Sequence, residues 1–280
     1  MANSKGMLEQ LASQLKELSE SLAIAEASEL PAIAAKRVHK TITEAYDRIR
    51  TVLDDLDPIK QPSFVFDPSD PNIAGRIAGL TMIAQARKPL DTVERIYGSG
   101  VYALYYIGDF PGYVAVSRRE HPIYVGKADP VEASSKTPVK QGDQLSKLLN
   151  EHRKNILKAA TTLHLDDFEY RALVVQTGWQ TAAEKYLIHL FKPIWNAEMK
   201  ICYGFGKHGD DPGTRANSRS PWDTLHPGRD WAHRDANMKD ARPERKILAD
   251  IEEHLVKYPA MESVDQILKH FLDQMRTMSV

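Results

Sequence analysis

The stretch GVYALYYIGDFPGYVAVSRREHPIYVGK, residues 100–127, decides the fold of this 280-residue chain. Two segments of this stretch, GVYALYYI (100–107) and HPIYVGKA (121–128), are rich in β-branched and aromatic residues. This composition predicts that each forms a strand. The Pro and Gly of the intervening DFPG predict a loop. Two Tyr–hydrophobic–Gly triplets, at 106–108 and 124–126, raise the question of whether the tyrosines pack the sheet or carry chemistry.

The residues that follow predict two helices and a third strand. GDQLSKLLNEHRKNILKAA (142–160) carries apolar residues at helical spacing, and FEYRALVVQ (168–176) has the composition of a strand. TAAEKYLIHLFK (181–192) predicts a helix that ends at the following proline. Together these segments predict a small α/β unit between Gly100 and Asn196.

The N-terminal residues predict two helices with apolar seams. Leucines recur at spacings of three and four over residues 7–26, and a second seam follows the break SELP, which is typical of a helical hairpin. Each seam spans few heptads, so we expect the seams to pack on each other or on the core; a dimer contact is the alternative. The predicted organisation is a helical hairpin arm (1–57), a connector wrapping the core (58–98), an α/β core (99–203), a loop region (204–240) and C-terminal helices (241–280).

Composition narrows the class of protein. The net charge is −1, so a nucleic-acid surface would have to be a local patch. A single cysteine, Cys202, excludes a disulfide framework and is typical of a reducing compartment. The start MANSKGMLEQ lacks the apolar region of a signal peptide, and no run reaches membrane-spanning length. We therefore expect a soluble protein of the cytoplasm.

Five ordered elements of the core carry a family resemblance. They are GVY ending at Tyr102, YVGK at 124–127, His152 in the following helix, Glu184 in AEKYLIHLF and Asn196 in KPIWN. In this order the chain resembles the GIY-YIG nuclease superfamily. The phrases GSGVYALYY, PIYVGKA and RSPWDTLHPGRDWA are most similar to its type II restriction endonuclease branch. The resemblance implies an α/β (α+β) fold with about three antiparallel strands flanked by helices, with helical extensions at both ends.

The resemblance also implies a catalytic set made of Tyr102, Tyr124, His152, Glu184 and Asn196. Glu184 would be the ligand of one Mg²⁺ ion per site, since a hard cation can keep several waters beside a single carboxylate. The first tyrosine would take part in activating water and the second would orient the site. A phenol has a reference pKa of about 10, so it is a poor base without help from its neighbours.

The remaining members of the set would handle phosphate and protons. His152 would relay a proton or contact the scissile phosphate. Asn196 would hold the backbone or a water, and Lys127 would meet phosphate. The YIG triplet at 106–108 is interpreted as a coincidence at the end of a strand, with Tyr105, Tyr106 and Tyr113 as packing residues.

The chain departs from the family at one position. The superfamily usually carries an arginine four residues before the histidine, where this chain has Leu148. Losing one preorganised donor can cost on the order of 10²–10³ in rate. Lys147, Arg153 or a loop arginine (Arg118 or Arg119) would replace it, or else the activity is attenuated; the sequence leaves these alternatives open.

Recognition of the DNA target is predicted to rest on residues 204–235. This segment mixes arginine, lysine and histidine with glycine and serine, and arginine suits guanine edges and phosphates. Aspartates largely balance the charge, so a solvated loop is the alternative, and Trp222 and Trp231 are expected to anchor the segment to the core. The predicted DNA-binding residues are Lys127, Arg153, Arg215, Arg219, His226 and Arg229, with the basic face of the helix at 142–160 as a second candidate surface.

The predicted activity is Mg²⁺-dependent, sequence-specific cleavage of double-stranded DNA, with a homodimer on a palindromic site implied by the family. One competing hypothesis is a DNA-binding protein of the same fold that no longer cleaves, suggested by Leu148. Another is a repair or homing nuclease, although such enzymes usually carry a separate DNA-binding domain.

Overall fold

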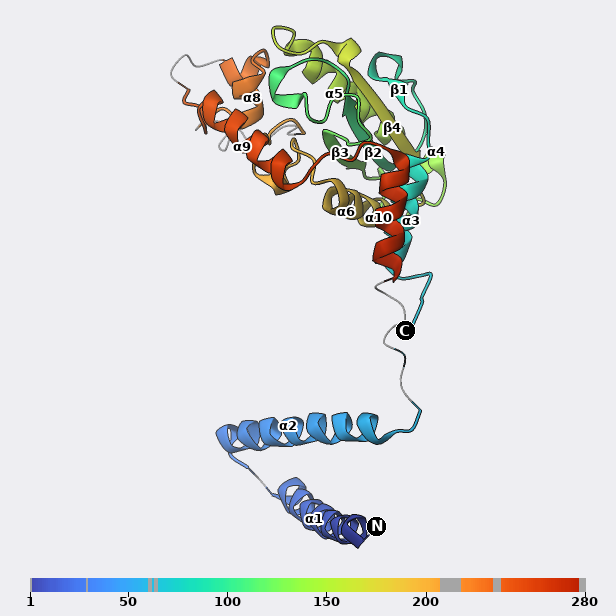
Figure 1. Cartoon of the computed structure of the whole chain (residues 1–280), viewed down its shortest axis with the longest axis vertical. Helices are drawn as coiled ribbons and strands as arrows, with labels where there is room; N and C mark the ends of the chain where they lie inside the picture. Colours follow the sequence, from blue (N-terminus) through green and yellow to red (C-terminus); the bar gives the residue numbers. More distant parts are fainter. Residues whose placement is uncertain are drawn as a thin grey trace. The chain divides into compact units, whose positions relative to one another are not determined.

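The computed structural model describes residues 2–28, 30–59, 62, 65–206, 218–233 and 238–276. The chain divides into two units, residues 1–63 and 64–279, of which the larger holds the predicted core (Figure 1). Within the described residues, no helix is long and apolar enough to cross a membrane.

The larger unit is built on one antiparallel sheet with the strand order β1-β4-β2-β3. The three predicted strands are confirmed as β2 (Gly100–Tyr106), β3 (Tyr124–Ala128) and β4 (Phe168–Val174). The sequence missed β1 (Lys88–Pro89), since two residues give no periodic pattern. Every residue of β2 is buried, because β2 is central and covered on both faces. The predicted mixed α/β class with a small antiparallel sheet is confirmed.

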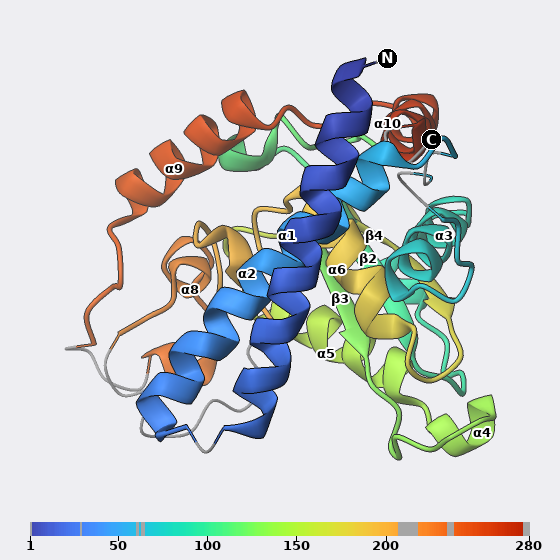
Figure 2. The same ribbon diagram turned by 90° about the horizontal axis from the view of Figure 1, so that it is seen from below.

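Helices cover both faces of this sheet (Figures 1 and 2). One face packs against α3 (Pro71–Ile83), α6 (Gln180–Phe191) and α10 (Val264–Arg276). The other packs against α5 (Gln144–Lys158), α8 (Pro221–Leu225) and α9 (Glu244–Lys257). The short helix α4 (Pro138–Gln141) precedes α5, and short 3₁₀ turns lie at 90–92, 111–113, 165–167, 197–199 and 230–233.

The alternation of β2 divides its side chains between the two cores. Tyr102, Leu104 and Tyr106 belong to the core under α5, whereas Val101 and Tyr105 belong to the core under α6. Tyr106 ends the strand, and its hydroxyl accepts a hydrogen bond from the Phe110 backbone N–H at 2.8 Å. The YIG triplet at 106–108 therefore has the packing role predicted for it.

The smaller unit contains α1 (Ala2–Ala27) and α2 (Ala32–Leu56). Both predicted helices form, but among the described residues of this unit their seams are not buried against each other. Leu8 is 63% exposed and Leu15 is 52% exposed, and α2 has no buried residue. The heptad spacing predicted the helices correctly, because spacing is a property of one helix, but it did not identify a partner surface.

A buried polar network ties α8 to the loop after β2. Tyr113 Oη lies 2.5 Å from His226 Nε2, and Thr162 Oγ1 lies 2.9 Å from His226 Nδ1. His226 is fully buried, and burial lowers its pKa to about 3. The same burial raises the pKa of the Cys202 thiol to about 12, so this cysteine is held as an unreactive thiol.

Acid should therefore weaken the fold through His226. Its pKa is about 3 in the folded protein and near 6.5 when unfolded, so between these values the unfolded chain binds more protons. We expect this residue to reduce the free energy of unfolding by about 1 kcal/mol per pH unit as the pH falls below 6.5.

Urea denaturation of the wild type and His226→Gln between pH 7.5 and 5 tests this expectation. The variant should show a smaller dependence on pH, and the exposed His189→Gln serves as the control. Equal slopes in all three proteins would contradict the assignment.

Candidate active site

Two tyrosines and a histidine meet on one face of the sheet. Tyr102 on β2 and Tyr124 on β3 project to the face covered by α5, with ring centroids 6.2 Å apart. His152 on α5 joins them, with ring centroids 5.4 Å from Tyr102 and 5.2 Å from Tyr124. Tyr102 Oη lies 2.6 Å from His152 Nε2, and both side chains are buried. These three residues, the first and last of which are 50 positions apart in the sequence, thus form one polar cluster.

Both phenols hold their protons firmly in this environment. Burial raises the pKa of Tyr102 well above its usual value, and the neighbouring Tyr124 and Glu184 act in the same direction. Burial raises the pKa of Tyr124 as well. Both phenols are therefore protonated at neutral pH.

Glu184 approaches the cluster from the helix on the opposite face of the sheet. It lies on α6, half-buried beside the terminal strand β3, and its charge acts on both Tyr102 and Tyr124. Burial raises the pKa of Glu184 to about 7, whereas the nearby Lys127 opposes that rise. The carboxylate on α6 thus lies beside β3, close enough for its charge to act on the tyrosines of the other face.

Asn196 closes that edge of the sheet. Its side-chain Oδ1 accepts from the Val125 N–H at 2.9 Å, and its Nδ2 donates to the Val125 carbonyl at 2.8 Å. The buried amide thus replaces a neighbouring strand for one residue of β3. The sequence predicted that Asn196 would contact either the backbone or a water, and the structure shows that it contacts the backbone.

The basic residues that were predicted to replace the family's arginine differ in whether they pair with a carboxylate. Leu148 is half-buried and packs against the core. The predicted replacements are mostly paired with carboxylates: Lys147 with Asp143, Arg118 with Asp109 and Arg119 with Glu262. Arg153 differs, because its buried Nε makes no hydrogen bond. Lys127 pairs with Asp129 and is the cation that acts on Glu184.

Two of the predicted DNA contacts lie in the protein interior. His226 is bonded to Tyr113 and Thr162, and Arg229 forms a bidentate ion pair with Asp223 at 2.6 Å from both carboxylate oxygens. Arg229 is 2% exposed. A buried guanidinium needs such partners, so these two residues are better explained as anchors of the loop region than as DNA contacts.

The other predicted recognition residues are placed only in part. Arg219 is half-buried, and its Nε donates to Asp240 at 2.7 Å. Arg215 lies outside the described residues, as do Lys207, His208 and Arg234. Trp222 is fully buried and anchors its segment to the core as predicted.

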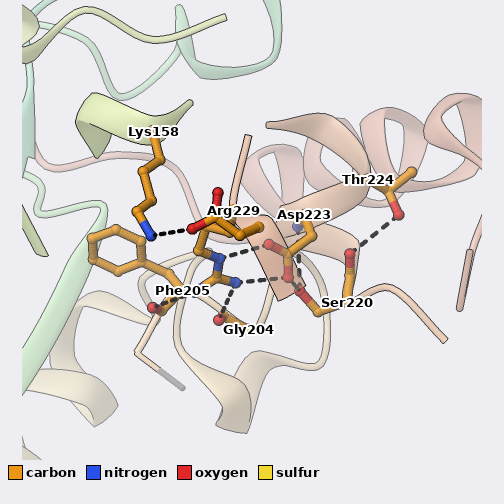
Figure 3. Close-up of polar contacts among 8 residues, drawn as sticks. Lys158, Gly204, Phe205, Ser220, Asp223, Thr224 and Arg229 are labelled. Carbon is orange, nitrogen blue, oxygen red and sulfur yellow. Dashed lines mark hydrogen bonds and ion pairs between the residues drawn. The ribbon is translucent and has the colours of Figure 1, made fainter. Parts of the chain in front are cut away.

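One residue near the site, Phe205, was missed from the sequence, and the interior role of Asp223 was not predicted. Phe205 is fully buried and stacks on His152, with ring centroids 4.6 Å apart and an angle of 20° between the planes. Asp223 is the buried partner of Arg229 (Figure 3). The only signal for Phe205 was an aromatic residue between glycines in YGFGK, which does not reveal a tertiary contact.

The sheet and its flanking helices are compatible with the fold of a GIY-YIG nuclease. Residues 94–255, more than half of the chain, match the family model of the Eco29kI GIY-YIG domain, so the chain belongs to that family of type II restriction endonucleases. No curated protein sequence gives a significant match to the chain. The family predicted from the motifs is thereby confirmed.

The residues around Glu184 fit a weakly ligated hard cation. Among the described residues, no group of three His, Cys, Asp or Glu side chains could hold a metal. A single carboxylate suits Mg²⁺, which keeps most of its waters in such sites. A proton would compete with a cation for this carboxylate, because the pKa of Glu184 is raised to about 7.

Mg²⁺ binding should therefore strengthen by about tenfold as the pH rises from 6 to 8, and level off above about pH 8, where Glu184 is almost fully ionised. Isothermal titration of the DNA-free protein at a series of pH values measures this dependence. The Glu184→Gln variant should show no such binding. An affinity that is constant over this range would mean that another group holds the cation.

Proposed function

We propose that this protein is a Mg²⁺-dependent endonuclease that cleaves double-stranded DNA at a specific sequence. The observation that carries the proposal is the buried Tyr102–Tyr124–His152 cluster beside Glu184, in a chain of the Eco29kI GIY-YIG family. Phosphodiester hydrolysis needs a proton acceptor, a carboxylate and an ordered site, and these groups supply them.

Proton transfer is assigned to the hydrogen-bonded pair of Tyr102 and His152. As water attacks phosphorus, its proton passes to Tyr102 Oη while the phenol proton passes to His152 Nε2, 2.6 Å away. The imidazole becomes an imidazolium, and the phenol is neutral before and after the step. This relay explains how a tyrosine with a raised pKa can serve near neutral pH.

Glu184 is assigned as the carboxylate that holds the cation. Bound Mg²⁺ would supply Lewis-acid stabilisation of the phosphoryl oxygens and of the leaving alkoxide. Tyr124 packs against the rings of both His152 and Tyr102 and orients them. Asn196 keeps the edge strand in place through its two bonds to Val125.

Contacts to DNA are assigned to cations that remain accessible. Lys127 lies beside Glu184 with its side chain 26% exposed, where a phosphate would come close to it. Arg153 and Arg219 are half-buried and can turn toward a bound duplex, and Arg215 is kept as a predicted contact from sequence. Restriction enzymes that recognise palindromes bind as two-fold dimers, and we extend the homodimer and the palindromic site to this chain as part of the proposal.

Leu148 favours one alternative, a protein that binds DNA but cleaves slowly or not at all. A half-buried leucine that packs on the core cannot donate to a phosphoryl oxygen. Incubation with Mg²⁺ and mixed-sequence plasmid separates the two: discrete fragments support the endonuclease, and a gel shift without fragments supports the binder. Sequencing the fragment ends then gives the site and the cut position.

Glu184→Gln should abolish cleavage, by at least about 10³-fold, and leave DNA affinity near that of the wild type, because the amide keeps the shape but loses the charge that holds a cation. Plasmid digestion and gel shifts measure the two properties. Glu253→Gln, the same change on the exposed face of α9, should leave both unchanged. Mg²⁺-dependent cutting by Glu184→Gln would refute the assignment.

Leu148→Arg should raise the cleavage rate if the arginine position is vacant, by up to about 10²-fold, since a preorganised donor would then face the phosphate. Single-turnover cleavage with saturating protein measures the rate. Leu157→Arg adds the same charge to an exposed position nine residues further along α5 and controls for general attraction to DNA. Equal rates for all three proteins would show that another cation already fills the role.

A further inference from the structure

Phe205 forms one wall of the catalytic cluster. Its ring stacks on His152 at 4.6 Å and meets the Tyr124 ring edge-on at 5.3 Å, with an angle of 77° between the planes. The next residue, Gly206, lies so close to Tyr124 that a Cβ atom there would come within 2.4 Å of the phenol oxygen. One short segment after the core therefore touches two of the proposed catalytic side chains.

A buried ion pair fixes the backbone of that segment (Figure 3). Arg229 donates from Nη2 to the Gly204 carbonyl at 2.8 Å and from Nη1 to the Phe205 carbonyl at 3.3 Å. Nε and Nη2 of the guanidinium also donate to the two carboxylate oxygens of Asp223, and the two side chains are 3% and 0% exposed. The guanidinium thus links the backbone around Phe205 to the start of α8.

Close packing around this ion pair leaves the segment little freedom. Gly204 has φ +113°, and a Cβ atom there would lie 2.1 Å from Ser220 Oγ, the hydroxyl that caps α8 and donates to Asp223. Gly228 has φ +145° and lies against the Lys158 carbonyl at the end of α5, the helix that carries His152. Glycine is needed at both positions because a side chain would be strained and would clash.

We propose that Phe205 is a positioning residue for His152 and that the Arg229–Asp223 ion pair holds Phe205 in place. The planar ring restricts rotation of the imidazole, which keeps Nε2 directed at Tyr102 Oη. The proposal rests on the endonuclease function proposed above, since it gives that reaction one more residue.

Phe205→Leu in the full chain is the test. Leucine keeps an apolar side chain but cannot stack, so kcat should fall about tenfold, the order expected from losing an aromatic contact, while KM and DNA affinity stay unchanged. Phe168→Leu is the matched control, because Phe168 is equally buried in the same core and its ring contacts Tyr106 and Trp195 rather than His152. The control should lose thermal stability to a similar extent and keep its kcat.

A second measurement does not depend on cleavage. In ¹⁵N NMR spectra of the histidine side chains, wild type and Phe168→Leu should show one neutral tautomer of His152, and Phe205→Leu should show averaged tautomers. Arg229→Lys, which keeps the charge but not the bidentate fork, should give the Phe205→Leu pattern in weaker form.

The two readouts separate the two hypotheses. Absence of cleavage by the wild type would refute the proposed function, and the NMR comparison would still test the positioning role. An unchanged His152 tautomer in Phe205→Leu, or an equal loss of kcat in both phenylalanine variants, would overturn the proposal.

Discussion

The terminal position of β3 in the sheet is the constraint on which the site depends. A side chain from the helix on one face can approach those on the other face only around an edge, and Glu184 does this beside β3. Asn196 makes the edge stable by bonding both backbone groups of Val125 with its side-chain amide. Without that substitute strand, buried backbone groups would be left unpaired at a cost of about 1–3 kcal/mol each.

Burial at this edge also sets the protonation of the site. It raises the pKa of Tyr102 and of Glu184, so both groups favour their neutral forms in the absence of a cation. The Tyr102–His152 hydrogen bond then provides a route for a proton, and cation binding would favour the ionised Glu184. The same environment that packs the tyrosines as core residues therefore prepares them for proton transfer.

The buried ion pair of Arg229 and Asp223 stabilises the fold. Arg229 and Asp223 look like recognition residues in sequence, in a segment rich in arginine, glycine and serine. Inside the protein they join the residues after the core to α8, and removing one partner of such a pair typically costs about 3–5 kcal/mol. Residue type alone does not distinguish an arginine that reads DNA from one that holds a loop.

The sequence by itself determined the three main strands, the helices that became α5, α6, α9 and α10, and the family, because these depend on local composition, periodicity and the order of short motifs. It also selected Tyr102, Tyr124 and His152, which the fold brings together. Only the tertiary structure decided that His226 and Arg229 are interior and that Phe205 stacks on His152. These properties depend on contacts between residues distant in the chain, and no local pattern encodes which distant surface a side chain will meet.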